Sequence, residues 1–261
     1  MPEILLGAGT VLSTEQADKA IAAGAKFIVS PGFNAKVVSH CINKGIPITP
    51  GCSGPSDIEQ ALEMGLEAVK FFPAEQAGGL EYIKAVSAPY SSMYFIPTGG
   101  INAQNLVKYI SFDKILACGG SWMVNPDLVN AGDYEKITAL CREAILSLLG
   151  FELLHMGINS ENEDTARKTA ASFSGLFGFV NRETTGAIFS SNQFEIMKSM
   201  GRGSMGHIGI SCNSVFRARA FLERQGIAFD EGSARLDDSG NLTFIYLKEE
   251  IGGFAVHIMR K

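Results

Sequence analysis

The amino-acid sequence predicts an α/β chain that begins with a (β/α)8-type parallel barrel lacking its first two βα units and continues with an α+β domain of two βαβββ modules. Two observations predict this fold class. In the first half, short apolar segments that end in Gly, Pro or Ser alternate with helix-like stretches, at intervals of about 19 to 24 residues. In the second half, two motifs occur twice in the same order, HMGIN (155–159) with FEIM (194–197) and HIGIS (207–211) with VHIM (256–259).

Six strands are expected in the first half, and nearly every residue in them is apolar. Strands of a parallel sheet are covered on both faces and therefore read as continuous apolar runs. The six segments are ILLG, KFIVS, IPIT, AVKFF, MYFIP and KILAC. A closed barrel of this type has eight strands, so the count predicts an incomplete barrel. A helix over 133–150 ends this half, and we place the boundary near Gly150, with domains at 1–150 and 151–261.

Each pair of motifs in the second half encloses a helix-like stretch and further strand material. The expected helices cover 165–178 and 214–226. The remaining strand segments are AIFSS, FDEGSARL and LTFIYLK. A period of about 50 residues is too long for a solenoid built of helix pairs, so the repeat indicates a duplicated βαβββ module.

The composition excludes several classes of partner. The chain has 261 residues, of which 46% are hydrophobic and 19% charged, and its net charge is −5 at pH 7. This balance is ordinary for a globular protein and gives no global attraction to nucleic acid or to an anionic membrane. We find no apolar run of the roughly 20 residues that a membrane span needs, no basic leader segment and no metal-type cysteine spacing. We therefore expect a cytoplasmic protein whose partners are small molecules.

One charged residue, Lys70, stands inside the apolar segment AVKFF and shares a strand face with Ala68 and Phe72. Such a lysine can extend its ammonium to the barrel rim or pair with a nearby acid. Alternatively, desolvation lowers the pKa of the amine and frees it to attack a carbonyl carbon as a Schiff-base nucleophile. Phe71 and Phe72 favour the second interpretation because they make the surroundings apolar.

Two glycine pairs, in PTGGI (97–101) and CGGSW (118–122), follow the last two expected strands. Phosphate groups bind at these loops in parallel barrels, because glycine lets backbone N–H groups approach an anion closely. Ser121 could add a hydroxyl donor. A single glycine pair is as often a tight turn, but two pairs at adjacent strand ends favour phosphate binding.

The motifs GAGTVL, SPG, VKFFPAE, PTGGI and GGSW occur here in the order and spacing of the 2-keto-3-deoxy-6-phosphogluconate/4-hydroxy-2-oxoglutarate aldolases, which residues 3–148 resemble. The resemblance implies a class I aldolase, needing no cofactor, that cleaves a keto acid or phosphorylated sugar acid to pyruvate and an aldehyde. Its Schiff-base lysine matches Lys70. Its phosphate site matches Gly99, Gly100, Gly120 and Ser121, and its substrate pocket matches Thr10, Pro31, Phe72 and Thr98.

The resemblance also implies that a glutamate general base and a carboxylate-binding arginine lie on a strand to which nothing in this sequence corresponds. The match begins at the family's third strand, so we expect either an N-terminally incomplete protein or an inactive remnant, and we favour incompleteness. Glu75 follows Lys70 closely but does not match the family's base. The family is typically trimeric, which predicts a homotrimer.

Three histidines and a glutamate occupy matching positions in the duplicated motifs of the second half. Alignment of the two modules pairs His155 with His207 and Glu195 with His257. Each lies on a different strand, so facing modules can bring all four into one cavity. Three imidazoles and a carboxylate suit Zn, Fe, Mn, Co or Ni better than Ca or Mg. The alternative is that these histidines merely form hydrogen bonds within half-buried strands, but their symmetry favours a metal site.

Residues 151–261 resemble the vicinal oxygen chelate (glyoxalase/dioxygenase) superfamily, whose metal ligands come from the first and last strand of each βαβββ module. The last ligand in that superfamily is usually a glutamate, where this sequence has His257. Three functions remain in competition: an aldolase fused to a metal- or ligand-binding module, a metal-dependent enzyme of the second type beside a degenerate barrel, and a non-catalytic protein that binds a keto acid or a phosphosugar.

Overall fold

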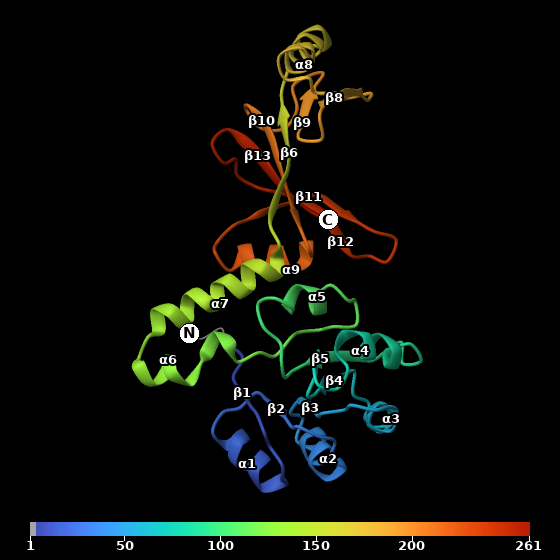
Figure 1. The fold of residues 1–261 in the computed structure, drawn as a ribbon, viewed down its shortest axis with the longest axis vertical. Helices are drawn as coiled ribbons and strands as arrows, with labels where there is room; N and C mark the ends of the chain where they lie inside the picture. Colours follow the sequence, from blue (N-terminus) through green and yellow to red (C-terminus); the bar gives the residue numbers. More distant parts are fainter. Residues whose placement is uncertain (1–3) are drawn as a thin grey trace. The chain divides into compact units, whose positions relative to one another are not determined.

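The computed structural model describes residues 4–261 and divides the chain into two compact units, Met1–Ala144 and Ile145–Lys261 (Figure 1). The division falls inside helix α7 (Tyr134–Leu149). Each unit has its own sheet and its own buried core, so each is described by itself. No helix in the described range is both long enough and apolar enough to cross a membrane.

The strands of the first unit run parallel and follow one another in chain order. They are β1 (Gly7–Ala8), β2 (Phe27–Val29), β3 (Ile48–Thr49), β4 (Ala68–Phe71) and β5 (Tyr94–Pro97). Strands β1 to β3 form one sheet and β4 pairs with β5, while a parallel bridge from Gly51 to Lys70 connects the two groups. The segment expected as the sixth strand contributes only two bridges, Phe95 to Ile115 and Thr98 to Gly119. The predicted parallel order is therefore confirmed.

The prediction of a strand at ILLG (4–7) is mostly wrong. Ile4, Leu5 and Leu6 lie outside any strand and are exposed, and pairing with β2 is limited to Gly7 and Ala8. No ladder or bridge joins β1 to residues 115–119 within the described part of the chain. Apolar residues with a partner strand on one side only gain little from ladder hydrogen bonds, so the strand stays short.

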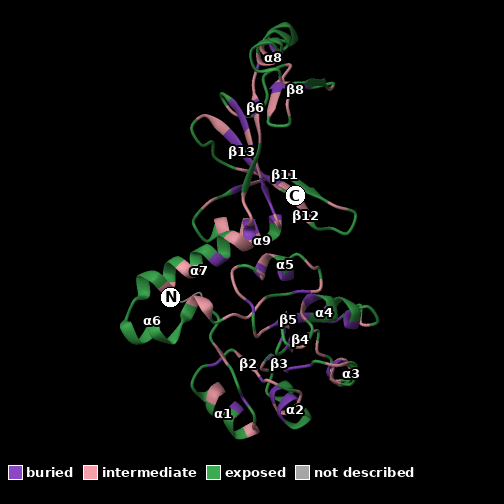
Figure 2. Ribbon diagram, viewed as in Figure 1, coloured by how far each residue is buried: buried purple, intermediate pink, exposed green. Residues whose placement is uncertain are grey.

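Helices alternate with the strands of this unit, and the first five of them bury side chains. They are α1 (Thr14–Ala22), α2 (Ala35–Asn43), α3 (Pro55–Glu63), α4 (Gly79–Ser87), α5 (Leu106–Ile110), the 3-10 helix η1 (Trp122–Val124), α6 (Pro126–Ala131) and α7. Ser13 caps α1 by accepting a hydrogen bond from the N–H of Gln16 at 3.3 Å. The buried residues concentrate on the strands and on the inward helix faces, where Val37 and Val38 pack with Ile28 and Ile48 (Figure 2).

The second unit is one eight-stranded mixed sheet made of two βαβββ modules, as predicted. The first module is β6 (Glu152–Ile158), α8 (Glu163–Phe177), β7 (Asn181–Glu183), β8 (Ala187–Ser190) and β9 (Phe194–Met197). The second is β10 (Gly206–Cys212), α9 (Val215–Glu223), β11 (Phe229–Leu236), β12 (Leu242–Leu247) and β13 (Phe254–Arg260). The strand order is β11-β12-β13-β10-β6-β9-β8-β7, so the modules meet at the antiparallel pair β6–β10.

Each helix of the second unit packs against the last two strands of its own module. Helix α8 buries Ile188 and Ile196 of β8 and β9, and α9 packs in a core with Ile245 and Ile258 of β12 and β13. Side chains alternate between the two faces of a strand. The neighbours of these isoleucines, Glu195 and His257 among them, therefore belong to the face that α8 and α9 leave uncovered, called the open face below.

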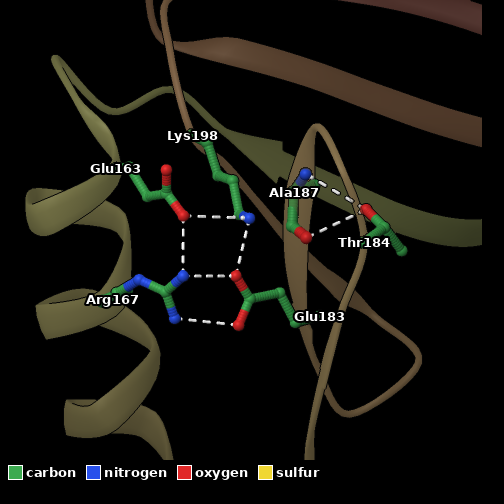
Figure 3. A network of polar contacts seen from close by, with 6 residues as sticks. All are labelled: Glu163, Arg167, Glu183, Thr184, Ala187 and Lys198. Atoms are coloured by element: carbon green, nitrogen blue, oxygen red, sulfur yellow. Dashed lines mark hydrogen bonds and ion pairs between the residues drawn. The ribbon is translucent and has the colours of Figure 1, made fainter.

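Strand β7 has no counterpart among the segments expected from the sequence, and its residues are all exposed. Side-chain contacts hold it in place (Figure 3). Arg167 of α8 pairs with Glu163 at 2.7 Å and with Glu183 of β7 at 2.6 Å, and Lys198 pairs with the same two carboxylates at 3.1 and 2.6 Å. The Thr184 hydroxyl bonds both backbone groups of Ala187 and closes the β7–β8 turn. Polar contacts thus replace the apolar pattern that would have revealed this strand.

Candidate functional sites

Lys70 lies on β4, half-buried, with its Nζ 4.4 Å from the centroid of the Phe72 ring. Burial lowers the pKa of its ammonium below the ordinary value of 10.5. No carboxylate in the described part of the chain lies within ion-pair distance of Nζ. The strand is fixed on both sides, because the Lys70 N–H donates to Pro50 and its carbonyl accepts from Cys52 on one side, while β4 pairs with β5 on the other. An amine held in this way is suited to nucleophilic attack.

The loop after β5 lies directly beside this lysine. Gly99 and Gly100 have φ angles of 96° and 81°, in the left-handed region that favours glycine. A Cβ on Gly99 would stand 3.2 Å from Phe72, so the loop packs against the ring that contacts Lys70. The N–H of Thr98 donates to Phe71, and Ala74 donates to Thr98. Thr98, Phe72 and the glycine pair are therefore brought to the same strand ends as Lys70.

The second glycine loop reaches the first through Thr98. Gly119 forms a bridge with Thr98, and a Cβ there would stand 2.6 Å from the Thr98 hydroxyl. Gly120 is covered by the ring of Trp122, and Ser121 is exposed at the start of η1, where it makes no capping hydrogen bond. The two loops predicted to bind phosphate are thus adjacent, with the Ser121 hydroxyl open to solvent.

Thr10 and Pro31 occupy the loops after β1 and β2. Thr10 is exposed and has a φ of 59°, which is unusual for a β-branched residue. The carbonyl of Pro31 lies against Gly51, which bridges Lys70. All the residues predicted for the first site therefore follow strands at the same end of the parallel array, although Thr10 is three strands away from Lys70.

The structure adds one pair that the sequence did not reveal. The hydroxyl of Tyr109, buried on α5, donates a hydrogen bond to the carboxylate of Glu75. Burial and this carboxylate raise the pKa of Tyr109. The N–H of Glu75 also donates to Gly99 at 3.2 Å, and a Cβ on Gly100 would stand 2.6 Å from the Glu75 side chain. Glu75 thus supports the glycine loop.

The second site lies on the open face of the second unit, where the four residues predicted as metal ligands meet. His155 Nε2 is 3.1 Å from His207 Nε2 and 3.2 Å from His257 Nε2. Glu195 Oε2 is 3.2 Å from His207 Nε2 and 3.5 Å from His155 Nε2. Donor atoms that bind a metal tetrahedrally at 2.0–2.1 Å are roughly 3.3–3.4 Å apart. The three histidine side chains therefore form a group that could hold a metal ion, with ligand atoms all within 4.8 Å of one another, and Glu195 lies beside two of them.

Each histidine on the two central strands stands over a glycine of the other strand. The register pairs His207 with Gly157 and His155 with Gly209. A Cβ on Gly209 would be 2.7 Å from the His155 ring, and one on Gly157 would overlap the His207 ring. The repeated unit is therefore His-x-Gly, in which the glycine of one module makes room for the histidine of the other. The sequence contains this signal, but the prediction of the site was based on the histidines and the glutamate alone.

Burial disfavours the protonated form of two histidines of this cluster. It lowers the pKa of His155 and lowers that of His257 to about 3, and the charge of Arg235 contributes to the second shift. The hydrogen bond from His207 lowers the pKa of Glu195. Nδ1 of His257 is buried without a hydrogen-bond partner, so packing against Phe244 and Tyr246, at ring distances of 4.5 and 5.0 Å, orients this ring. Neutral imidazoles beside a carboxylate are the form that binds metal.

Comparison with known proteins bears on the first unit. The family described as KDPG and KHG aldolase matches residues 1–140. The 2-dehydro-3-deoxy-phosphogluconate aldolase of Treponema pallidum is 52% identical over 143 residues, which cover 55% of this chain and 68% of that protein.

Two solved structures show a similar fold. The 2-keto-3-deoxy-6-phosphogluconate aldolase of Zymomonas mobilis ZM4, crystallised with 3-phosphoglycerate, matches with a TM-score of 0.51 and 39% identity over 55% of this chain and 68% of its own. The KDPG aldolase of Legionella pneumophila matches with a TM-score of 0.52 and 38% identity over 54% and 68% of the two chains. Its structure holds pyruvate as a covalent carbinolamine intermediate.

Proposed function

This chain belongs to the KDPG and KHG aldolase family, and from that membership we propose that its first unit is a class I aldolase with Lys70 as the Schiff-base residue. The observation that carries the proposal is the position of Lys70. Its amine is half-buried against Phe72, lacks an acidic partner in the described chain and adjoins the Thr98–Gly100 loop. The covalent pyruvate adduct of the Legionella relative supports the same chemistry.

The proposed reaction cleaves a 2-keto-4-hydroxy acid, such as 2-keto-3-deoxy-6-phosphogluconate or 4-hydroxy-2-oxoglutarate, to pyruvate and an aldehyde. The neutral amine of Lys70 attacks the keto carbon, and loss of water gives an imine. The protonated imine accepts the electron pair of the C3–C4 bond as that bond breaks, while the C4 hydroxyl loses its proton to a base and becomes the aldehyde. Protonation of the enamine and hydrolysis then release pyruvate and restore Lys70.

The surrounding residues would bind the two ends of this substrate. We assign the substrate pocket to Thr10, Pro31, Phe72 and Thr98. We assign the phosphate to the backbone N–H groups of Gly99, Gly100 and Gly120 and to the hydroxyl of Ser121. Gly99 and Gly100 support this assignment because their φ angles of 96° and 81° lie in the left-handed region, in which successive backbone N–H groups can point toward an anion. The presence of 3-phosphoglycerate in the Zymomonas relative agrees with a phosphate-bearing ligand.

Reductive trapping tests the proposal. The full chain is incubated with pyruvate and borohydride, and the modified peptide is located by mass spectrometry. We expect the adduct on Lys70 and none in Lys70→Arg, because a guanidinium stays protonated. Lys84→Arg, a change on the exposed face of α4, serves as the matched control and should keep the adduct. An adduct on another lysine, or no adduct at all, would contradict the assignment.

For the second unit we propose a glyoxalase-like domain with a divalent metal centre held by His155, Glu195, His207 and His257. The convergence of the three histidine nitrogens within 4.8 Å favours it, as does Glu195 Oε2 at 3.2 and 3.5 Å from the nitrogens of His207 and His155. The βαβββ duplication supports the same domain type. A metal bound there would act as a Lewis acid toward an oxygen-bearing ligand. The donor set fits Zn, Fe, Mn, Co or Ni.

Metal analysis tests this second proposal separately from the first. After dialysis against Co²⁺ or Zn²⁺, we expect about one equivalent of metal in the native chain and none in His155→Ala or His207→Ala. His40→Ala is the matched control, because His40 lies in the first unit and pairs with Asp18. Equal metal contents in all four proteins would contradict the centre. The homotrimer and the cytoplasmic location expected from the sequence stay predictions, and sedimentation equilibrium would measure the first.

A further inference from the structure

Aromatic rings flank the proposed metal centre on the open face. Phe244 and Tyr246 of β12 lie beside His257, with ring centroids at 4.5 and 5.0 Å. On the opposite side, Phe189 of β8 stands directly across the ladder from Glu195. Directly paired residues share a face of the sheet. The centre therefore sits between two aromatic flanks, one from each module.

An arginine covers each of these rings. The guanidinium carbon of Arg235 lies 4.5 Å from the centroid of Phe244, that of Arg202 lies 4.6 Å from Tyr246, and that of Arg182 lies 4.5 Å from Phe189. A guanidinium that stacks on a ring keeps its N–H groups in its own plane, where they can still bind a carboxylate through two parallel hydrogen bonds.

The three arginines differ in what occupies those N–H groups. Arg202 is already bound to Asp230 at 2.6 Å. Arg182 and Arg235 have no carboxylate within ion-pair distance in the described part of the chain. Arg235 is the unpaired arginine that stacks on a ring in contact with a histidine of the cluster. Only one aromatic ring, Phe244, separates it from His257.

The charge of the site follows from these residues. Glu195 is the single carboxylate beside the three histidines, so a divalent cation bound there would outweigh its negative charge. Arg235 adds a further unmatched positive charge, while the charge of Arg202 is balanced by Asp230. A partly buried site with this excess of positive charge attracts an anion.

Resting on the metal centre proposed above, we propose that this centre takes a small carboxylate ligand and that Arg235 binds its carboxylate. One oxygen-bearing end of the ligand faces the histidine cluster, and the other reaches the guanidinium across Phe244. Arg235 is thereby a specificity-determining residue, which selects charged over neutral ligands. No covalent change in the ligand is part of this proposal.

Malonate tests the inference in the intact chain loaded with Co²⁺. Malonate has no keto group for Lys70 to attack, and malonamide provides a neutral analogue of the same size. Calorimetry measures the affinity of each probe, and the visible absorption of Co²⁺ separately measures metal loading. We expect malonate to bind and malonamide not to bind. We expect Arg235→Gln to weaken malonate binding by about tenfold or more, which is the effect of losing one charge-assisted pair of hydrogen bonds.

Arg182→Gln is the matched control, since Arg182 is also exposed and stacked on a ring but lies on the other flank. It should bind malonate within about twofold of the native chain. Unchanged affinity in Arg235→Gln, equal binding of malonate and malonamide, or no malonate binding would each overturn the inference. A further outcome separates the two proposals. If Co²⁺ does not bind, but malonate binds to the native chain and to Arg182→Gln and not to Arg235→Gln, the carboxylate site is supported and the metal centre is contradicted.

Discussion

The imidazole of His207 lies over Gly157, its register partner on the neighbouring antiparallel strand. The same relationship holds in reverse between His155 and Gly209. Two strands that each present a histidine and, two residues later, a glycine can pair closely only because each bare Cα makes room for the opposite ring.

Gly157→Ala should therefore damage the histidine cluster. The added methyl group overlaps the His207 ring, and overpacking of this kind costs about 1–3 kcal/mol. We expect a lower free energy of unfolding for the second unit and weaker Co²⁺ binding, measured by denaturation and by visible absorption. Gly175→Ala, within α8 and with open space around its Cα, should leave Co²⁺ binding unchanged and stabilise the helix by about 0.5–1 kcal/mol. Equal Co²⁺ affinity in both variants would contradict the packing argument.

The pH dependence of pyruvate trapping should follow the amine of Lys70. The attacking form is the neutral amine, which becomes dominant above the pKa, and burial lowers this pKa from 10.5. The initial trapping rate should therefore rise with pH and reach half of its maximum at a lower pH than for Nα-acetyl-lysine under the same conditions. A midpoint at or above that of the free amino acid would show that burial does not activate this residue.

The hydrogen bond between Tyr109 and Glu75 should stabilise the loop that carries Gly99 and Gly100. Tyr109→Phe removes the donor while keeping the buried ring, so we expect a loss of about 1 kcal/mol in the free energy of unfolding of the first unit. Glu75→Gln and the double variant complete a thermodynamic cycle. Strictly additive effects would mean that the two residues act independently.

The ion pairs of Arg167 and Lys198 should hold β7 in a manner that depends on pH and salt. These cations lower the pKa of Glu163 and Glu183 in the folded state, so the stabilisation is present above the ordinary carboxyl pKa of 4.5 and is lost as the pH falls through the folded-state values. The protection factors of the amides of residues 181–183, taken relative to the intrinsic exchange rate at each pH, should fall in acid, in 1 M salt and in Glu183→Gln. Glu161→Gln is the control, and identical exchange in the two variants would exclude a role for the pairs.

The sequence was informative where a pattern depends on local geometry. Apolar runs with regular spacing revealed the parallel strands, and the duplication placed one donor on each of four strands, so that His155 and His257 could be expected to meet. Such periodicities arise from the alternation of side chains along a strand, which the sequence records directly.

The remaining features depend on contacts that no local pattern records. The position of Arg235 on the open face depends on an irregular register between β11 and β12, where pairing jumps from Asp230 to Arg235. Tyr109 meets Glu75 only because α5 packs beside the loop after β4, 34 positions earlier in the chain. The β7 strand is polar throughout and depends on ion pairs with α8, so its residues read as a loop.

The distribution of donors between the two modules has a consequence for biosynthesis. The first module provides His155 and Glu195, and the second provides His207 and His257, which follows His155 by 102 positions. While the ribosome has released only the first module, His155 and Glu195 are the only two of these donors present, and two donors would bind a metal ion weakly. If the proposed centre binds a metal, tight binding requires β13 to have emerged and paired with β10, so the nascent chain would acquire the ion only after the second module has folded onto the first.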